Sequence, residues 1–147
     1  MDNMLQRKAR QATSIRTTLA VLALLLAAGL TAANAQQQAP KGNQGFTATK
    51  VQTVDLGPEI PGMEGRQLRF RLLTIEPGGH IGIHSHKDRP AVVYFLQGTD
   101  TITLGDGTVK TLHPGDTGTA TKDTTHWHRN DGKEPVVFVA VDILHKK

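Results

Sequence analysis

Hydrophobic and polar residues alternate in short runs along most of the chain after residue 48. The run QLRFRLLTI, residues 67–75, is the clearest case, because Leu68, Phe70 and Leu72 alternate with polar side chains. A period of two residues places successive side chains on opposite faces of a β-strand. No segment between residues 48 and 147 shows a helical period. The pattern therefore predicts an all-β domain, built as a sandwich or a barrel.

Turn residues divide this region into further strands. Gly105-Asp106-Gly107 is a hairpin signal, because Asp-Gly tolerates the positive φ of a tight turn. The sequence Pro77-Gly78-Gly79 is expected to break the strand before it, and residues 57–65 (GPEIPGMEG) are expected to form a loop. The predicted strands cover residues 67–75, 80–86, 91–96, 101–104, 108–112, 124–129 and 135–144. The sequence contains no internal repeat, so we expect one β-domain per chain.

The first 35 residues have the layout of a secretory signal peptide. A basic start is followed by the apolar run Leu19–Leu30 and then by the small residues Ala33-Asn34-Ala35. Twelve apolar residues are fewer than the roughly 20 that a membrane-spanning helix needs. We therefore expect cleavage after Ala35, no stable membrane insertion afterwards, and a periplasmic or secreted protein.

The remaining chain divides into a leader and one domain. Residues 36–47 are polar and rich in Gln, which is typical of a flexible leader, and residues 48–147 are expected to form the β-domain. Removing the four basic residues and the one acid of the signal from 17 Lys/Arg and 13 Asp/Glu leaves 13 and 12. This near-neutral part has no basic stripe with interleaved aromatic residues, so nucleic acid is not an expected partner. With no cysteine in the chain, disulfides and thiol chemistry are excluded.

Three histidines carry the clearest chemical signal. His84 and His86 are two residues apart, so both side chains point to the same face of an extended strand. His126 follows on a second predicted strand, about forty residues later. A neutral imidazole is the commonest protein ligand for metals, and three of them hold a divalent ion with a position left open. We predict a metal site at His84, His86 and His126. The alternative is that all three are surface histidines on turn-rich strands.

The same segments resemble the two signature motifs of the cupin family. The first motif places Gly, His-x-His, Glu and Gly at fixed spacings, and GGHIGIHSHKDRPAVVYFLQG has Gly78, His84, His86 and Gly98 in place. The second places Gly, Pro-x-Gly, His and Asn, and GDTGTATKDTTHWHRN has Gly115, His126 and Asn130 in place. The resemblance implies a jelly-roll barrel (a double-stranded β-helix) and a bound metal.

Three motif positions depart from the family pattern, because Ala91, Thr121 and Asp123 replace Glu, Pro and Gly. Without the glutamate, the ligand set is all nitrogen, and such a set suits one divalent transition metal such as Fe, Zn, Cu or Ni. It also leaves a coordination position for water, dioxygen or a substrate. Some cupin dioxygenases, including those that act on thiols, use three histidines and no glutamate. The departure is thus compatible with an enzyme.

Other polar residues share the expected inner face. His80 lies four residues before His84, and His128 lies two residues after His126, so both are candidates for the pocket and for a fourth ligand. Gln97 has the parity of Ala91 and is a further candidate. A β-bulge or a strand end would turn these side chains outward instead.

Two arginines oppose the apolar face of residues 67–75. Arg69 and Arg71 either face the pocket and bind an acidic substrate or face water, and the alternation favours water. The apolar strand near the C-terminus is expected to include an edge that needs covering, and with the family resemblance this favours a homodimer.

The residues leave open whether the protein is an enzyme. The leading hypothesis is a secreted metal-binding cupin, specifically a dioxygenase-like oxidoreductase acting on a small molecule. The second is a non-catalytic module that binds a metal or a small ligand, in which His80 or His128 closes the metal's coordination shell. The third is a metal-free cupin whose motifs are a relic.

Overall fold

The computed structural model describes residues 38–146. The regular secondary structure of these residues consists of β-strands. The eight strands are β1 (Gln44–Asp55), β2 (Arg66–Ser85), β3 (Ala91–Gln97), β4 (Asp100–Leu104), β5 (Val109–Leu112), β6 (Thr117–Ala120), β7 (Thr125–Arg129) and β8 (Val136–His145). The predicted all-β class is confirmed, and residues 57–65 form the expected loop. Strand β6 was not predicted, because Thr117–Ala120 is short and offers no apolar alternation.

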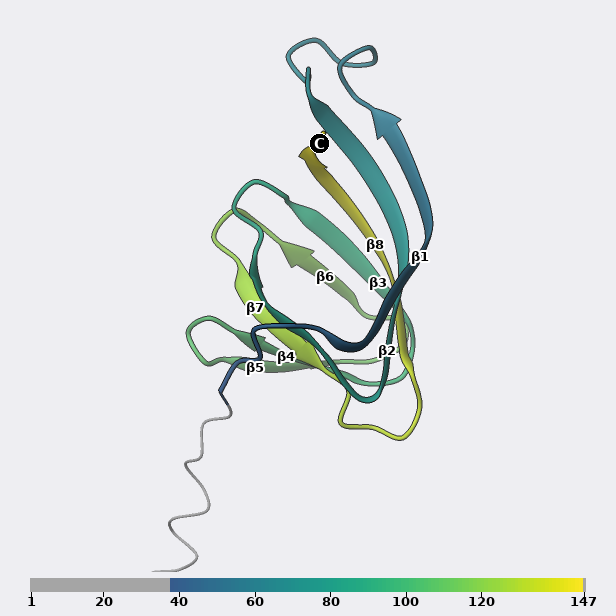
Figure 1. The fold of residues 1–147 in the computed structure, drawn as a ribbon, viewed down its shortest axis with the longest axis vertical. Coiled ribbons are helices and arrows are strands. Elements are labelled where there is room, and N and C mark those ends of the chain that lie inside the picture. The colour runs from purple at the N-terminus through teal and green to yellow at the C-terminus, as the bar shows by residue number, and fades with distance from the viewer. Residues whose placement is uncertain (1–37, 147) are drawn as a thin grey trace, which may run out of the picture. The chain divides into compact units, whose positions relative to one another are not determined.

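One sheet curls into a nearly closed barrel (Figure 1). Its strand order is β5-β4-β7-β2-β8-β3-β6, with β1 paired to β2 at the side, and the neighbours pair in antiparallel fashion. The long strand β2 joins the two walls, because residues 66–75 pair with β8 and residues 80–85 pair with β7. This is the jelly-roll architecture that the motifs implied.

The expected break at Pro77-Gly78-Gly79 is wrong, because β2 runs through it. Gly78 adopts a φ of 74°, which a residue with a side chain rarely tolerates, and its amide donates to the carbonyl of Asn130 at 2.9 Å. A Cβ on Gly79 would lie 2.8 Å from the carbonyl oxygen of Gln44. The two glycines thus let β2 bulge, and pass close beside β1, without leaving the sheet.

Part of the predicted leader belongs to the barrel. Strand β1 begins at Gln44, and Phe46 packs, half-buried, against the core. The carbonyl of Pro40 accepts a hydrogen bond from Ile83 at 2.7 Å, and the Asn43 side chain accepts one from Gly82 at 2.9 Å. Backbone pairing with β2 therefore orders this polar stretch, which composition alone could not show. The predicted signal peptide lies outside the described residues. Within residues 38–146, no helix has the length and hydrophobicity to cross a membrane.

The core is built from inward-facing residues of four strands, β2, β3, β4 and β8. Its buried members are Leu73, Ile75, Ile81, Phe95, Ile102, Val136, Phe138 and Ala140. The rings of Phe95 and Phe138 stack with centroids 5.0 Å apart. Along β8, buried and half-buried residues alternate, so the strand presents one face to this core.

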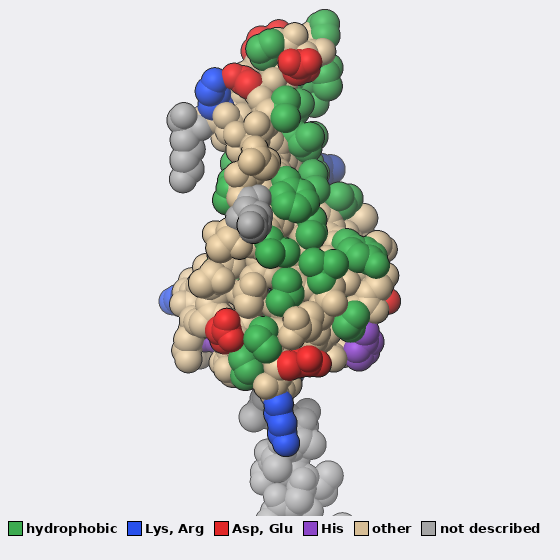
Figure 2. Space-filling view, turned by 90° about the vertical axis from the view of Figure 1, so that its right-hand side faces the viewer, with side chains coloured by type: hydrophobic (Ala, Val, Ile, Leu, Met, Phe, Trp, Pro, Cys, Tyr) green, Lys and Arg blue, Asp and Glu red, His purple; other side chains and the backbone are tan. Residues whose placement is uncertain are grey.

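The opposite face of the sheet is apolar yet exposed. Hydrophobic side chains gather in a band along the middle of the face that Figure 2 shows. On β3, Val92, Tyr94 and Leu96 are 54%, 47% and 48% exposed, and on β2 Phe70 is 38% exposed. The alternation in β2 favoured a buried face with Phe70 and an exposed face with the arginines. The structure shows the reverse, because Phe70 points outward and the arginines on either side of it point inward.

Candidate metal centre

Two neighbouring strands bring the histidines of both motifs together. His84 lies near the end of β2 and pairs in register with His126 on β7, so both side chains point to the same face of the sheet. His86 follows directly after the last residue of β2, and its amide donates to the carbonyl of Thr124 at 2.9 Å. His128 lies two residues beyond His126 on β7, on the same face.

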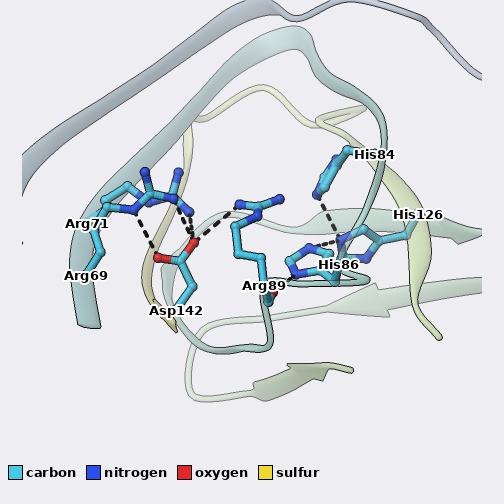
Figure 3. Close-up of polar contacts among 7 residues, drawn as sticks. All are labelled: Arg69, Arg71, His84, His86, Arg89, His126 and Asp142. Atoms are coloured by element: carbon cyan, nitrogen blue, oxygen red, sulfur yellow. Dashed lines mark hydrogen bonds and ion pairs between the residues drawn. The ribbon is translucent and has the colours of Figure 1, made fainter. Parts of the chain in front are cut away.

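The imidazole nitrogens converge on His126. Its Nε2 lies 3.1 Å from Nε2 of His84 and 3.1 Å from Nε2 of His86 (Figure 3). Two nitrogens bound at about 2.0–2.1 Å to one ion would lie about 2.9 Å apart at a right angle and about 3.4 Å apart at a tetrahedral angle. Both observed separations fall within this range, so His84 and His86 each lie at the spacing from His126 that two ligands to one ion would have.

A second group of three overlaps the first. Single ligand atoms of His84, His126 and His128 all lie within 4.8 Å of one another. His84 and His126 belong to both groups, and His86 joins them through its contact with His126. The site therefore comprises four imidazoles, and His126 is the one that the others contact.

Hydrogen bonds at the far side of two rings fix their tautomers. Nδ1 of His84 donates to the Gly82 carbonyl at 2.9 Å, and Nδ1 of His86 donates to the Arg89 carbonyl at 2.8 Å. A carbonyl can only accept, so in the neutral ring each Nε2 keeps its lone pair and turns it toward the centre. Metal-binding histidines in proteins are held in this way.

His128 is oriented by a buried carboxylate instead. Its Nδ1 donates to Oδ2 of Asp100 at 2.6 Å, and the Asp100 side chain is 0% exposed. The His128 ring stacks on Phe138 with centroids 5.8 Å apart, so it is fixed from two sides. Asp100 was missed in the sequence. Asp100 lies two residues before Ile102 and four before Leu104 in β4, so its carboxylate points to the same inward face as these apolar side chains. That spacing was the signal in the sequence.

Burial keeps these imidazoles neutral. Desolvation is the main cause that lowers the pKa of His84 to about 4 and that of His126 to about 2, and it also lowers the pKa of His86. The positive charges that the neighbouring imidazoles and Arg89 would add act in the same direction. Neutral rings with free lone pairs are the form that binds a metal.

The other two pocket candidates lie outside the cavity. His80 and Gln97 are not among the residues that line it. On β2, Ile81 pairs with His128 and His84 pairs with His126, so one extra residue shifts the parity and Ile81 faces inward in place of His80. A similar shift between Phe95 and Gln97 leaves Gln97 exposed. These are the bulges that turn such side chains outward.

Asn130 of the second motif has a structural place. Its Nδ2 donates to the carbonyls of Ile75 and Glu134 at 2.9 and 2.8 Å, and its Oδ1 accepts from the amide of Gly132 at 2.9 Å. Fully buried, it ties the turn after β7 to β2. The motif asparagine thus holds β7, and with it His126, against β2.

A cavity of about 690 Å³ opens beside the imidazoles. Its walls are largely apolar, and its lining includes all four imidazoles together with Ala91, Val93, Phe138, Arg71 and Arg89. Ala91, at the position of the family's glutamate, pairs in register with Asp142 of β8. A carboxylate is thus present one strand away from the usual place.

That carboxylate is held by three arginines rather than left free (Figure 3). Arg69 forms two bonds to Asp142, at 3.0 and 2.8 Å, while Arg71 and Arg89 reach its Oδ2 at 2.8 and 3.3 Å. The expectation that Arg69 and Arg71 face water is therefore wrong. The missed signal was Asp142 itself, the one charged residue in the apolar run PVVFVAVDIL.

Comparison with solved structures confirms the fold. A predicted oxalate decarboxylase from Thermotoga maritima superposes with a TM-score of 0.51 and 19% identity, over 74% of this chain and 96% of its own. A structure of oxalate oxidase gives 0.50 and 18%, over 69% of this chain and 55% of its own. An uncharacterised Klebsiella pneumoniae protein with a double-stranded β-helix domain is 26% identical, with a TM-score of 0.49, over 54% of this chain and 76% of its own.

Sequence comparison agrees with the architecture. No curated protein matches this chain significantly. Residues 71–142 match the family profile of the cupin domain, and that range contains both histidine motifs and strands β3 to β7. The chain therefore carries a small domain of the cupin family.

Proposed function

We propose that this chain is a secreted or periplasmic cupin that binds one divalent transition metal and acts on a small molecule in the adjoining cavity. His84, His86 and His126 would hold the ion, with His128 as the fourth nitrogen. The observation that carries the proposal is the convergence of these rings on His126, with the tautomers of His84 and His86 set by backbone carbonyls.

The residues present fit such an ion. An all-imidazole set suits Fe, Zn, Cu or Ni, and the buried rings are neutral without any cost of deprotonation. When bound, the ion would supply Lewis acidity or an oxygen-binding centre, as in a dioxygenase-like oxidation. The protein's own part is to fix the rings, through Asp100 and two carbonyls, and to enclose the ligand between apolar walls that exclude water.

A specific observation favours the second candidate, a non-catalytic binding module. His128 is as firmly oriented as the other rings, and four nitrogens would complete a tetrahedral shell. The cavity argues for the enzyme, since a volume of about 690 Å³ is in the range of small-molecule sites. The number of protein nitrogens on the ion separates the two candidates.

The test uses the full chain after chelation and reloading with single metals. A metal at about 100 times its Kd stabilises the native state by about 2.7 kcal/mol, which for a domain of this size raises the Tm by roughly 10 °C. We expect that shift for the wild type and for His113→Ala, which removes an exposed turn histidine. In His86→Ala the shift should vanish at the same metal concentration.

The visible spectrum of the Co(II)-loaded protein then distinguishes the candidates. Strong absorption typical of four-coordinate cobalt would favour the module. Weak absorption that changes when a ligand is added would favour the enzyme, as would oxygen uptake by the Fe(II)-loaded protein. If no metal raises the Tm of the wild type, both candidates fail and the metal-free alternative stands.

We also propose that the protein is a homodimer. Val92, Tyr94 and Leu96 form an exposed apolar row on β3, beside the outward residues of β8. Apolar rows of this kind on a sheet face mark association sites. A second copy of this chain is the occupant we propose.

A further inference from the structure

The charges inside the barrel do not balance. Within residues 38–146, Asp142 is the one carboxylate bonded to Arg69, Arg71 and Arg89, so three positive charges meet one negative charge and leave a formal charge of +2. Its side chain is fully buried and those of the arginines are 15–28% exposed, so water screens the excess only in part. A buried charge without a counter-ion is costly, which makes such a group attract an anion.

The surplus charge faces the cavity. Arg69 is matched to Asp142 by two bonds and does not line the cavity, whereas Arg71 and Arg89 each make one bond to Oδ2 and do line it. Nε of Arg71 is buried and has no hydrogen-bond partner among the described residues. Arg71 and Arg89 therefore have donors to offer to a ligand.

Small residues leave room in front of these guanidinium groups. Arg71 pairs with Ala140, Ala140 pairs with Val93, and Val93 pairs with Gly118, so one inward row crosses four strands with little side-chain volume. In Figure 3, Arg89 stands between the Asp142 group and the imidazoles. A ligand in the cavity would thus meet the guanidinium groups at one end and the histidines at the other.

We infer that Arg71 and Arg89 form an anion subsite, which binds the carboxylate of a small organic acid in the cavity. The planar fork of a guanidinium matches the two oxygens of a carboxylate. The apolar part of the lining, which includes Ala91, Val93 and Phe138, suits the hydrocarbon part of such an acid better than an inorganic oxyanion. The inference rests on the proposed function for the role of the ligand's other end, but carboxylate binding itself requires no metal.

The experiment is calorimetric titration of the full chain with benzoate and with its neutral isostere benzamide. Both ligands are titrated into chelator-treated protein and into zinc-loaded protein, with sodium sulfate as the inorganic anion. We expect benzoate to bind more than about tenfold more tightly than benzamide or sulfate in both forms, because only benzoate offers a planar charged acceptor.

Matched variants place the effect at the subsite. Arg71→Met and Arg89→Met should each weaken benzoate binding by roughly tenfold or more and leave benzamide binding unchanged, because each loses one charge-assisted hydrogen bond. Lys133→Met removes the same charge from the exposed β7–β8 turn and should change nothing. If Arg71→Met does not fold, Arg89→Met still decides, because the Arg89 side chain is the most exposed of the three arginines.

The outcomes separate this inference from the proposed function. Equal binding of benzoate and benzamide, or benzoate binding that survives both arginine variants, would overturn the subsite even if zinc raises the Tm. Sulfate binding as tight as benzoate binding would overturn the assignment to organic acids. Benzoate binding that depends on Arg71, in a protein that no metal stabilises, would support the subsite and refute the metal centre.

Discussion

Replacement of Asp142 by Asn should be among the most damaging single changes in the barrel. The carboxylate is fully buried, and three guanidinium groups contact it within 3.3 Å. Asn keeps the shape but removes the negative charge, so three partly buried cations are left without their counter-ion. Breaking a buried ion pair from one side typically costs about 3–5 kcal/mol.

Urea denaturation at low temperature measures this cost. A loss of about 3–5 kcal/mol would lower the Tm by more than about 10 °C and would remove a large part of the roughly 5–15 kcal/mol that holds a typical domain folded. The control is Asp123→Asn, whose carboxylate is 80% exposed and pairs with Lys122 at 3.5 Å. That change should cost less than about 0.5 kcal/mol.

A double variant tests the cause. If repulsion among the guanidinium groups dominates, adding Arg71→Met to Asp142→Asn should restore about 1 kcal/mol or more, because it removes one of the repelling charges. A cost for Asp142→Asn no larger than that of the control, or no recovery in the double variant, would refute the reasoning and show that water screens these charges.

The acid stability of the wild type follows from the same group. Burial raises the pKa of Asp142, but the hydrogen bond from Arg69 and the charges of the three arginines outweigh it, so the pKa is lowered overall. A carboxyl whose pKa is lowered in the folded state stabilises the fold at pH values above its pKa in the unfolded chain, which is about 3.9 for Asp. Its contribution should therefore be lost only as the pH falls below about 4.

Three further predictions concern the histidines and the outer face. Asp100→Asn should weaken metal binding by about 10–100-fold, as measured by competition with a chelator, because His128 loses the carboxylate that orients it. Burial lowers the pKa values of His84 and His126, so below about pH 6.5 the unfolded chain binds more protons than the folded chain. The free energy of unfolding should therefore decrease as the pH falls. At pH 5.5 each histidine kept neutral costs about 1.4 kcal/mol, so urea midpoints that stay constant from pH 7.5 to 5.5 would contradict the burial of these rings. Tyr94→Glu should convert the dimer to a monomer in analytical ultracentrifugation without lowering the Tm of the monomer, and a wild-type monomer at all concentrations would exclude the proposed dimer.

The sequence by itself determined the fold class and the centre of the site. Spacing of two residues places His84 and His86 on one face, and motif spacing predicted that His126 meets them, as the 3.1 Å contacts confirm. Only the first inference depends on local geometry, since the period of a strand is set by the backbone itself. The second depends on the resemblance to the family motifs, because His126 lies about forty residues away. The resemblance of the two motifs then supplied the barrel.

Tertiary structure decided which face of each strand is inside. Alternation along β2 shows that Arg71 and Phe70 lie on opposite faces, but it cannot show that Phe70 is the exposed one. That depends on the buried counter-charge of Asp142, which arrives from β8 about seventy residues later. Bulges have the same effect, because one extra residue in β2 exchanged His80 for Ile81 at the inner face. Which side chains share a face is a local property of a strand, whereas burial of that face depends on the neighbouring strands. The position of Arg71 and Arg89 around Asp142 therefore follows only from the tertiary structure.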